Sequence, residues 1–305
     1  MASAIALREI ASVPYAVLAP EQTVPVPLCI FLLGAGGTRE NLIDLQPVFD
    51  GWWNEGLLPP MAIAVPTPGP DYISWDEFLA GDLIPQVRAE FQATEAVVLA
   101  GISGGGYGAL KLAFAHPEMF AAVATMQPML EPGLRESDVG ERNRLHHIAV
   151  PPPGAALWEA NNPANRARAN VQEIRHSGMA IYVEAADRDF LNAHDGAEFL
   201  HRTLWDLDLA HEYHLALDAD HGGPTMRPRM RAMFAWLGAF LRPPVADPAV
   251  EEAAAAWLGS GMQGKPPAGA TTSEAFIQFM RARFEPLREK AAESDPAVKR
   301  RYGVM

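Results

Sequence analysis

Short runs of apolar, often β-branched residues recur along the first 242 residues and alternate with amphipathic segments of helical period. The apolar runs predict strands over residues 14–18, 28–33, 61–65, 96–101, 121–125, 180–185 and 212–217;. The amphipathic segments predict helices over residues 39–54, 75–91, 104–116, 194–209 and 225–241;. This alternation is typical of an α/β protein, a mostly parallel doubly wound sheet with helices on both faces.

Two stretches interrupt the alternation. Residues 126–170 hold many prolines and polar residues and are too long for a simple connection, so we expect an inserted cap or binding loop there;. Residues 243–305 begin with "RPPVADP" and contain "GSGMQGKPPAGATT", two linker-like clusters between expected helices;. The pattern therefore predicts a main domain over residues 1–242 and a helical C-terminal extension over residues 243–305.

The extension carries one strong helical pattern. Thr271 followed by Glu274 fits a capping box, and an apolar stripe begins after it;. The stripe consists of Phe276, Met280, Phe284, Leu287 and Ala291;. It needs a surface to cover, which could be the main domain, the rim of a binding pocket or a second copy of the chain in a homodimer.

Composition and charge narrow the class of partner. The 305 residues are 49% hydrophobic and 20% charged, which is ordinary for a globular protein, and their formal net charge is −13;. This negative charge disfavours a nucleic acid or an anionic membrane surface as partner. The sequence holds no apolar run of about 18 residues, so we expect no membrane span;. Arg8 and Glu9 interrupt the first apolar stretch, so we expect no secretory signal;. We therefore expect a cytoplasmic location.

Cys29 is the single cysteine and lies within the apolar run "PLCIFLLG". It has no partner in the chain for a disulfide or for a metal site built from several cysteines. We expect a buried thiol in the core, and we expect no metal or cofactor.

The segment "GISGGG", residues 101–106, surrounds Ser103 with glycines at the point where an expected strand meets an expected helix. This context is typical of a nucleophile elbow, a tight turn that exposes a serine hydroxyl above the edge of the sheet. The backbone N–H of Gly104 would then face a developing oxyanion. A phosphate-binding loop is disfavoured because the Gly-Lys-Ser/Thr ending is missing, and a turn that serves packing alone is the remaining alternative.

A serine hydroxyl is a weak nucleophile and needs a base that is itself oriented by an acid. Asp187 and Asp189 follow the expected strand over 180–185, and His221 lies in "DADHGG" after the last expected strand. This gives the chain order Ser, Asp, His. We expect Asp189 to be the acid and Asp187 to cap its turn.

The second oxyanion donor should lie in the loop after the strand over 28–33, which reads "GAGGTREN";. The N–H of Ala35 is the best candidate there. The other interpretation of this loop is a flexible turn without a role in binding.

The segments "FLLGAGGTREN", "SWDEFLAGDLIPQV", "GISGGGYGALKLAFAHPEMFAAVATM", "NNPANRARA", "EAADRDFLNAHDGAEFLHRTL" and "DADHGG" resemble the esterase D group of α/β hydrolases, which includes S-formylglutathione hydrolase and the mycolyltransferases. The resemblance spans about residues 28–241. It implies an α/β hydrolase fold with Ser103 as nucleophile, Asp189 as acid and His221 as base. It also implies an oxyanion hole made by the amides of Ala35 and Gly104. Leu33 departs from the polar residue, commonly histidine, that the group has at this position.

These residues predict a serine esterase that forms an acyl-enzyme and needs no cofactor. The same residues could open a lactone, cleave a carbon–carbon bond or transfer the acyl group to an alcohol, and a non-catalytic binding module is the alternative from another class. An apolar or aromatic small-molecule ester is the expected substrate. Candidates for contact with it are Met126, Trp158, Phe190 and Trp75, together with Tyr72, His146 and His147.

Overall fold

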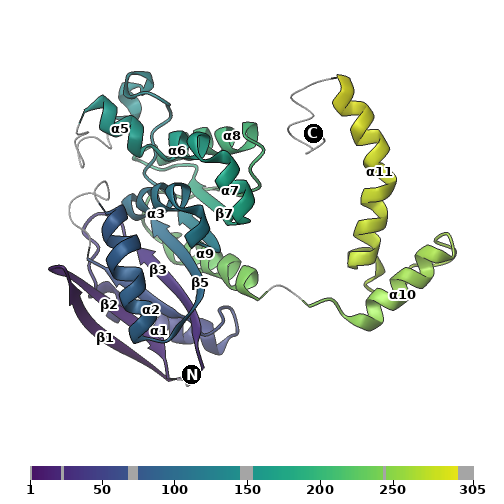
Figure 1. The fold of residues 1–305 in the computed structure, drawn as a ribbon, viewed down its shortest axis with the longest axis horizontal. Helices are drawn as coiled ribbons and strands as arrows, with labels where there is room; N and C mark the ends of the chain where they lie inside the picture. Colours follow the sequence, from purple (N-terminus) through teal and green to yellow (C-terminus); the bar gives the residue numbers. More distant parts are fainter. Residues whose placement is uncertain (1, 22–23, 68–74, 145–153, 243–244, 295–305) are drawn as a thin grey trace. The chain divides into compact units, whose positions relative to one another are not determined.

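The structure is a computed structural model that describes residues 2–21, 24–67, 75–144, 154–242 and 245–294 (Figure 1). It divides into two compact units, Met1–Arg242 and Pro243–Met305. This boundary coincides with the proline-rich start of the predicted extension.

The first unit contains an eight-stranded sheet in the order β1-β2-β4-β3-β5-β6-β7-β8. Strand β2 runs antiparallel to its neighbours β1 and β4, and all other neighbouring strands are parallel. The mostly parallel sheet expected from the sequence is therefore confirmed. The strands are β1 Ser3–Ile10, β2 Val13–Pro20, β3 Val26–Leu32, β4 Ala62–Pro66, β5 Ala93–Ile102, β6 Ala122–Met126, β7 Ala180–Ala186 and β8 Glu212–Ala216.

Alternating side chains of the central strands feed two separate hydrophobic cores. On β3, Leu28, Ile30 and Leu32 belong to one core, while Cys29 and Phe31 belong to the other. The first core is covered by α2 Ile84–Glu90, α3 Gly104–Ala115, α6 Pro163–Ala169, α7 Val171–Ser177 and α8 Ala193–Asp206. The second is covered by α1 Asn41–Asn54 and α9 Met226–Leu241, and Figure 1 shows α3 in front of the sheet with α9 behind it. Helices on both faces are thus confirmed.

The helix expected over residues 75–91 is not regular along its length. A π-helical segment, Phe78–Leu83, precedes α2, whose first turn contains Pro85. A proline has no N–H to donate, so it is tolerated in a first turn and favours a new helix start at this point.

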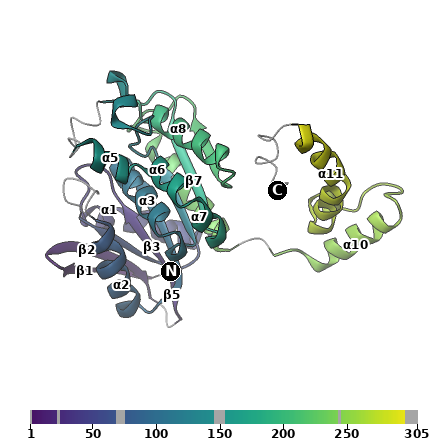
Figure 2. The ribbon, with the colours of Figure 1, turned by 45° about the horizontal axis from the view of Figure 1, so that its top comes forward.

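Much of the stretch expected as an insertion is helical rather than a loop. Short 3₁₀ turns occur at Glu136–Asp138 and Glu141–Asn143, and α5 Ala155–Asn161 precedes α6. Asn162 caps the start of α6, because its side chain accepts hydrogen bonds from the N–H groups of Ala164 (2.8 Å) and Asn165 (3.3 Å);. Figure 2 shows α5, α6, α7 and α8 grouped beside α3.

Cys29 lies in the middle of β3 and is fully buried. It is paired in register with Ile63 of β4 on one side and Val98 of β5 on the other. Burial raises the pKa of this thiol well above its ordinary value, because a thiolate would lose its hydration there;.

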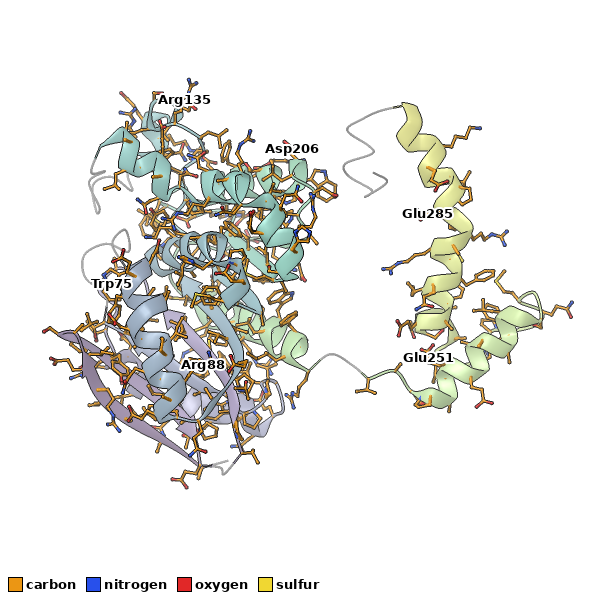
Figure 3. All side chains as sticks on the ribbon, viewed as in Figure 1. Trp75, Arg88, Arg135, Asp206, Glu251 and Glu285 are labelled. Carbon is orange, nitrogen blue, oxygen red and sulfur yellow. The ribbon has the colours of Figure 1, made fainter. Side chains whose placement is uncertain are left out.

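The second unit contains α10 Pro248–Gly259 and α11 Glu274–Ser294. The carboxylate of Glu251, labelled in Figure 3 on α10, accepts hydrogen bonds from the N–H groups of Glu274 and Ala275, each at 2.9 Å. The Trp257 and Phe276 rings stack between the two helices, with their centroids 6.2 Å apart.

The predicted capping box at Thr271 is wrong. Thr271 lies inside the 3₁₀ turn Ala270–Thr272, and the helix is capped by the Ser273 hydroxyl, which accepts from the N–H of Phe276 (3.1 Å). The Glu274 side chain accepts instead from the Gln278 amide, 3.2 Å away. The expected apolar stripe is partly exposed at Phe284 (46%) and Leu287 (60%), and a homodimer formed through it stays a prediction.

Within the described part of the chain, every helix is too short or too polar to cross a bilayer.

Candidate active site

Ser103 lies between the end of β5 and the start of α3, with φ 57° and ψ −124°. A residue with a side chain rarely adopts this backbone conformation, so the surrounding structure must hold it. The Ser103 N–H donates to the carbonyl of Met126 (3.1 Å), and the Ser103 carbonyl accepts from the N–H of Met129 (3.0 Å). Met126 is the last residue of β6 and Met129 follows in the next turn, so this segment fixes the strained turn.

The glycines around the serine are required by close backbone packing. A Cβ atom on Gly101 would lie 2.5 Å from the carbonyl oxygen of Gly105, and one on Gly105 would lie 2.0 Å from the carbonyl oxygen of Leu32. Neither contact is tolerated, so α3 can start directly above the sheet only with glycine at these positions. The tight strand-to-helix turn expected from "GISGGG" is present.

The structure brings Ser103, His221 and Asp189 together. The Nε2 atom of His221 lies 2.9 Å from Ser103 Oγ, and its Nδ1 atom lies 2.7 Å from Asp189 Oδ2. The Asp189 side chain is fully buried, and 13% of the His221 side chain is exposed. The three residues follow β5, β7 and β8, whose carboxyl ends meet at one edge of the parallel sheet;.

Three aspartates fix the two loops that carry Asp189 and His221. Asp189 Oδ1 accepts from the N–H of Leu191 (2.8 Å), which leaves its second oxygen toward the imidazole. Asp187 accepts from the N–H of Ala219 (3.1 Å), and this backbone bond lowers the Asp187 pKa. Asp187 is therefore placed to cap the turn, and Asp189 is the one that reaches the histidine.

Asp220 joins the same two loops from the other side. Its Oδ1 atom accepts from the N–H groups of Phe190 (2.9 Å) and His221 (2.7 Å). Both bonds favour the ionised carboxylate, and the first is the larger cause of the lowered pKa of Asp220;.

The loop with Gly34 and Ala35 lies directly beside the serine. A Cβ atom on Gly34 would lie 2.8 Å from the Cβ and 3.3 Å from the Oγ of Ser103. Gly104 is the first residue of α3, where N–H groups have no partner inside the helix;. The Gly34 backbone and the start of α3 therefore both lie beside Ser103, and the role of the Ala35 and Gly104 N–H groups as oxyanion donors stays a prediction.

The four candidates for substrate contact have different surroundings. The Phe190 ring is 64% exposed and lies edge-on to the His221 ring, with 5.7 Å between centroids. Trp158 is half-buried, and its indole N–H donates to the Glu131 carboxylate. Met126 and Trp75 are instead part of the two hydrophobic cores, where Trp75 packs on Phe78.

Tyr72, His146 and His147 lie outside the described residues. Of the substrate-contact candidates that the structure describes, Phe190 is the residue with a ring contact to His221.

Sequence reasoning missed a buried polar cluster beneath the His221 loop, formed by Gln127, Glu184 and Arg229. Glu184 interrupts the apolar run "AIYVEAA" of β7, which was a visible signal, whereas Gln127 and Arg229 have no spacing that would indicate their role. Burial raises the pKa of Glu184, and the hydrogen bond and charge of Arg229 oppose that rise.

Among the described residues, no group of three or more histidine, cysteine or acidic side chains is arranged to hold a metal ion. The expectation that no cofactor is needed stays a prediction.

The sequence matches the Esterase family, described as "Putative esterase", over residues 51–236. The chain belongs to the Esterase family. As a member of this family, the protein is a carboxylic ester hydrolase. Ser103 and His221 both lie within the matched residues. A search of curated proteins finds no relative of the sequence.

Solved structures of α/β hydrolases share the fold of this Esterase family member. A ferulic acid esterase matches with a TM-score of 0.62 and 17% identity, over 78% of this chain and 98% of its own. An S-formylglutathione hydrolase from Agrobacterium tumefaciens matches with a TM-score of 0.59 and 15% identity, over 78% and 95%. MPT51 (FbpC1) from Mycobacterium tuberculosis matches with a TM-score of 0.61 and 16% identity, over 79% and 100%. The α/β hydrolase fold implied by the sequence is confirmed.

Proposed function

We propose that the protein cleaves carboxylic esters through an acyl-enzyme formed on Ser103. His221 acts as base and acid, Asp189 orients it, and the N–H groups of Ala35 and Gly104 stabilise the oxyanion. The observation that carries this proposal is the position of the imidazole, 2.9 Å from Ser103 Oγ and 2.7 Å from Asp189 Oδ2.

The hydrogen-bond chain defines the direction of proton transfer. A carboxylate can only accept, so the Nδ1 atom of His221 carries a proton and its Nε2 atom is left to accept from the Ser103 hydroxyl. As Oγ attacks the acyl carbonyl, its proton moves to Nε2, and the buried Asp189 carboxylate stabilises the imidazolium;. The imidazolium then gives this proton to the departing alcohol oxygen.

Water completes the cycle. His221 takes a proton from water as the water oxygen attacks the acyl carbonyl, and the proton returns to Ser103 Oγ when the acid leaves. Each tetrahedral intermediate places negative charge on the former carbonyl oxygen, where two fixed N–H donors lower the barrier.

We propose an apolar or aromatic acyl ester as substrate. The exposed Phe190 ring beside His221 supports this choice, because an aromatic face next to the reacting atoms favours flat or apolar groups;. The ferulic acid esterase and S-formylglutathione hydrolase among the structural neighbours suggest esters of aromatic acids and acyl thioesters as the first compounds to test.

The decisive experiment compares the wild-type protein with Ser103→Ala. We expect a fluorophosphonate probe to label the wild-type protein on Ser103 and to leave the variant unmodified. We expect kcat of the variant on an aryl ester to be at least ~10³-fold lower than that of the wild type, while its circular dichroism spectrum is unchanged. Full ester hydrolysis by the folded variant would refute the mechanism.

A panel of further compounds separates ester hydrolysis from the alternative activities. Lactones, vinylogous diketones and an added alcohol as acyl acceptor test ring opening, carbon–carbon cleavage and acyl transfer by the same three residues. A folded wild-type protein that neither reacts with the probe nor turns over any of these compounds would favour a non-catalytic binding module.

A further inference from the structure

Two buried side chains bind the backbone of the loop that carries His221. The Arg229 Nη1 atom donates to the Asp220 carbonyl (2.7 Å), and the Gln127 Nε2 atom donates to the His221 carbonyl. These carbonyls belong to the histidine and to the residue before it, so both bonds act directly on the backbone that places the imidazole.

The buried Glu184 carboxylate fixes Arg229, and Arg229 in turn holds the Gln127 side chain. Arg229 donates to both oxygens of Glu184, from Nε at 2.7 Å and from Nη2 at 3.1 Å. Its Nη2 atom also donates to Gln127 Oε1 (2.5 Å), and the Gln127 N–H donates to the Glu184 carbonyl (2.7 Å). The guanidinium therefore uses its planar fork to set three partners at once, which a lysine ammonium cannot do with the same geometry.

The cluster connects the segments next to all three proposed catalytic residues. Gln127 directly follows Met126, whose carbonyl holds the Ser103 N–H. Glu184 lies in β7, which leads into the loop of Asp189, and Arg229 lies on α9, which follows the loop of His221. A displacement of any one member would change the spacing between the serine, the aspartate and the histidine.

Stability alone explains this cluster poorly. Arg229, Glu184 and Gln127 are 7%, 3% and 1% exposed. Removing two charges from water costs free energy that their attraction often only balances, and apolar residues of similar volume commonly serve a core as well or better. This buried ion pair is better suited to hold geometry, because Arg229 also donates to the Asp220 carbonyl and to Gln127, which binds the His221 carbonyl.

We propose that Arg229 and Gln127 are positioning residues that hold His221 between Ser103 and Asp189 by binding the carbonyls of Asp220 and His221. The proposal rests on the proposed function, because it takes those three residues as the catalytic triad. Neither side chain is expected to touch substrate, so their loss should lower kcat and leave KM nearly unchanged.

The experiment measures kcat and KM per reactive serine in Arg229→Lys, Arg229→Met and Gln127→Met. Saturating fluorophosphonate labelling counts the serines, so a loss of folded protein does not enter kcat. Arg229→Lys keeps a cation beside Glu184 and is the variant most certain to fold. We expect kcat to fall about 10- to 100-fold in the Arg229 variants and about 10-fold in Gln127→Met, with KM within about threefold of the wild type, because small misplacements of reacting groups carry such costs.

Met233→Ala is the matched control. Met233 lies one turn further along α9, is fully buried and has its place in the hydrophobic core under the sheet. Its truncation lowers the thermal midpoint by removing packing, and we expect wild-type kcat per labelled serine.

The outcomes separate this proposal from the proposed function. Lowered kcat with unchanged KM in the Arg229 and Gln127 variants, and not in the control, supports positioning. Wild-type kcat per labelled serine in Arg229→Lys and Gln127→Met overturns it while the triad stands. Ester hydrolysis that survives Ser103→Ala refutes the proposed function itself, whatever the Arg229 variants do.

Discussion

Gly34 and Ser103 are in direct contact, because a Cβ atom on the glycine would lie 2.8 Å from the Cβ of the serine. Gly34→Ala must therefore displace the loop that carries the Ala35 N–H. We expect kcat on an aryl ester to fall by about 10-fold or more, since oxyanion donors act over a narrow range of distance. Steady-state kinetics test this.

Gly51→Ala is the control for that substitution, because a Cβ atom on Gly51 of α1 meets no atom within 4 Å. It should leave kcat unchanged. Wild-type kcat in folded Gly34→Ala would show that the contact with the serine is not critical for the reaction.

Asp189→Asn should lower kcat by about 10⁴-fold, because an amide in place of the carboxylate favours the wrong tautomer of His221. Asp187→Asn should change kcat by no more than about threefold, since an amide oxygen can still accept from the Ala219 N–H;. The two rates, measured side by side, identify the acid. A reversed order would assign Asp187 to the triad.

His201 and His211 should make the protein less stable below neutral pH. His211 Nδ1 lies 2.7 Å from the Leu209 carbonyl and must carry its proton there, so its Nε2 accepts from His201 Nδ1, 2.8 Å away;. Burial lowers the pKa of both histidines below the ordinary value of 6.5. Their contribution to stability is thus present above pH 6.5 and is lost as the pH falls through the lowered values.

Urea unfolding at pH 7.5 and pH 5.5 measures that loss. In His211→Gln we expect a smaller difference in the free energy of unfolding between the two pH values than in the wild-type protein. His176→Gln, at an exposed histidine on α7, should show the wild-type difference. Equal differences in all three proteins would contradict the role of the buried pair.

Asp76 should be important for stability. Its carboxylate is 3.0 Å from the buried Lys111 ammonium of α3 and 2.6 Å from the Arg166 guanidinium of α6. Asp76→Ala leaves both cations without this anion, which should cost about 3–5 kcal/mol of the free energy of unfolding. Glu95→Gln breaks a surface pair with Arg88 and should cost less than about 1 kcal/mol;. Equal losses in urea unfolding would argue against this difference.

The central strands and the meeting of Ser103, Asp189 and His221 could be predicted from sequence because each has a strong physical signature. Buried parallel strands read as continuous apolar runs, and the elbow requires glycine on both sides of Ser103. Strand β1 was missed for an equally physical reason. Its hairpin turns through Ala11 (φ 48°) and Ser12 (φ 64°), where the usual sequence signal is Asn-Gly;.

The buried polar cluster beneath the His221 loop could not be predicted from sequence. Gln127, Glu184 and Arg229 are separated along the chain and meet only because the fold brings the end of β6, strand β7 and helix α9 together. The start of α11 was similarly ambiguous, since Thr271 and Ser273 are both good caps and only the 3₁₀ turn before the helix selects Ser273;.

Cys29, held between β4 and β5, can serve as a reporter built into the protein. As the sole thiol of the chain, buried and protonated, it should stay unmodified by a water-soluble maleimide until the sheet opens, so the labelling rate would measure global unfolding under native conditions;. The same protection leaves any cysteine introduced at the surface as the one site for a fluorophore, without first having to remove the natural residue.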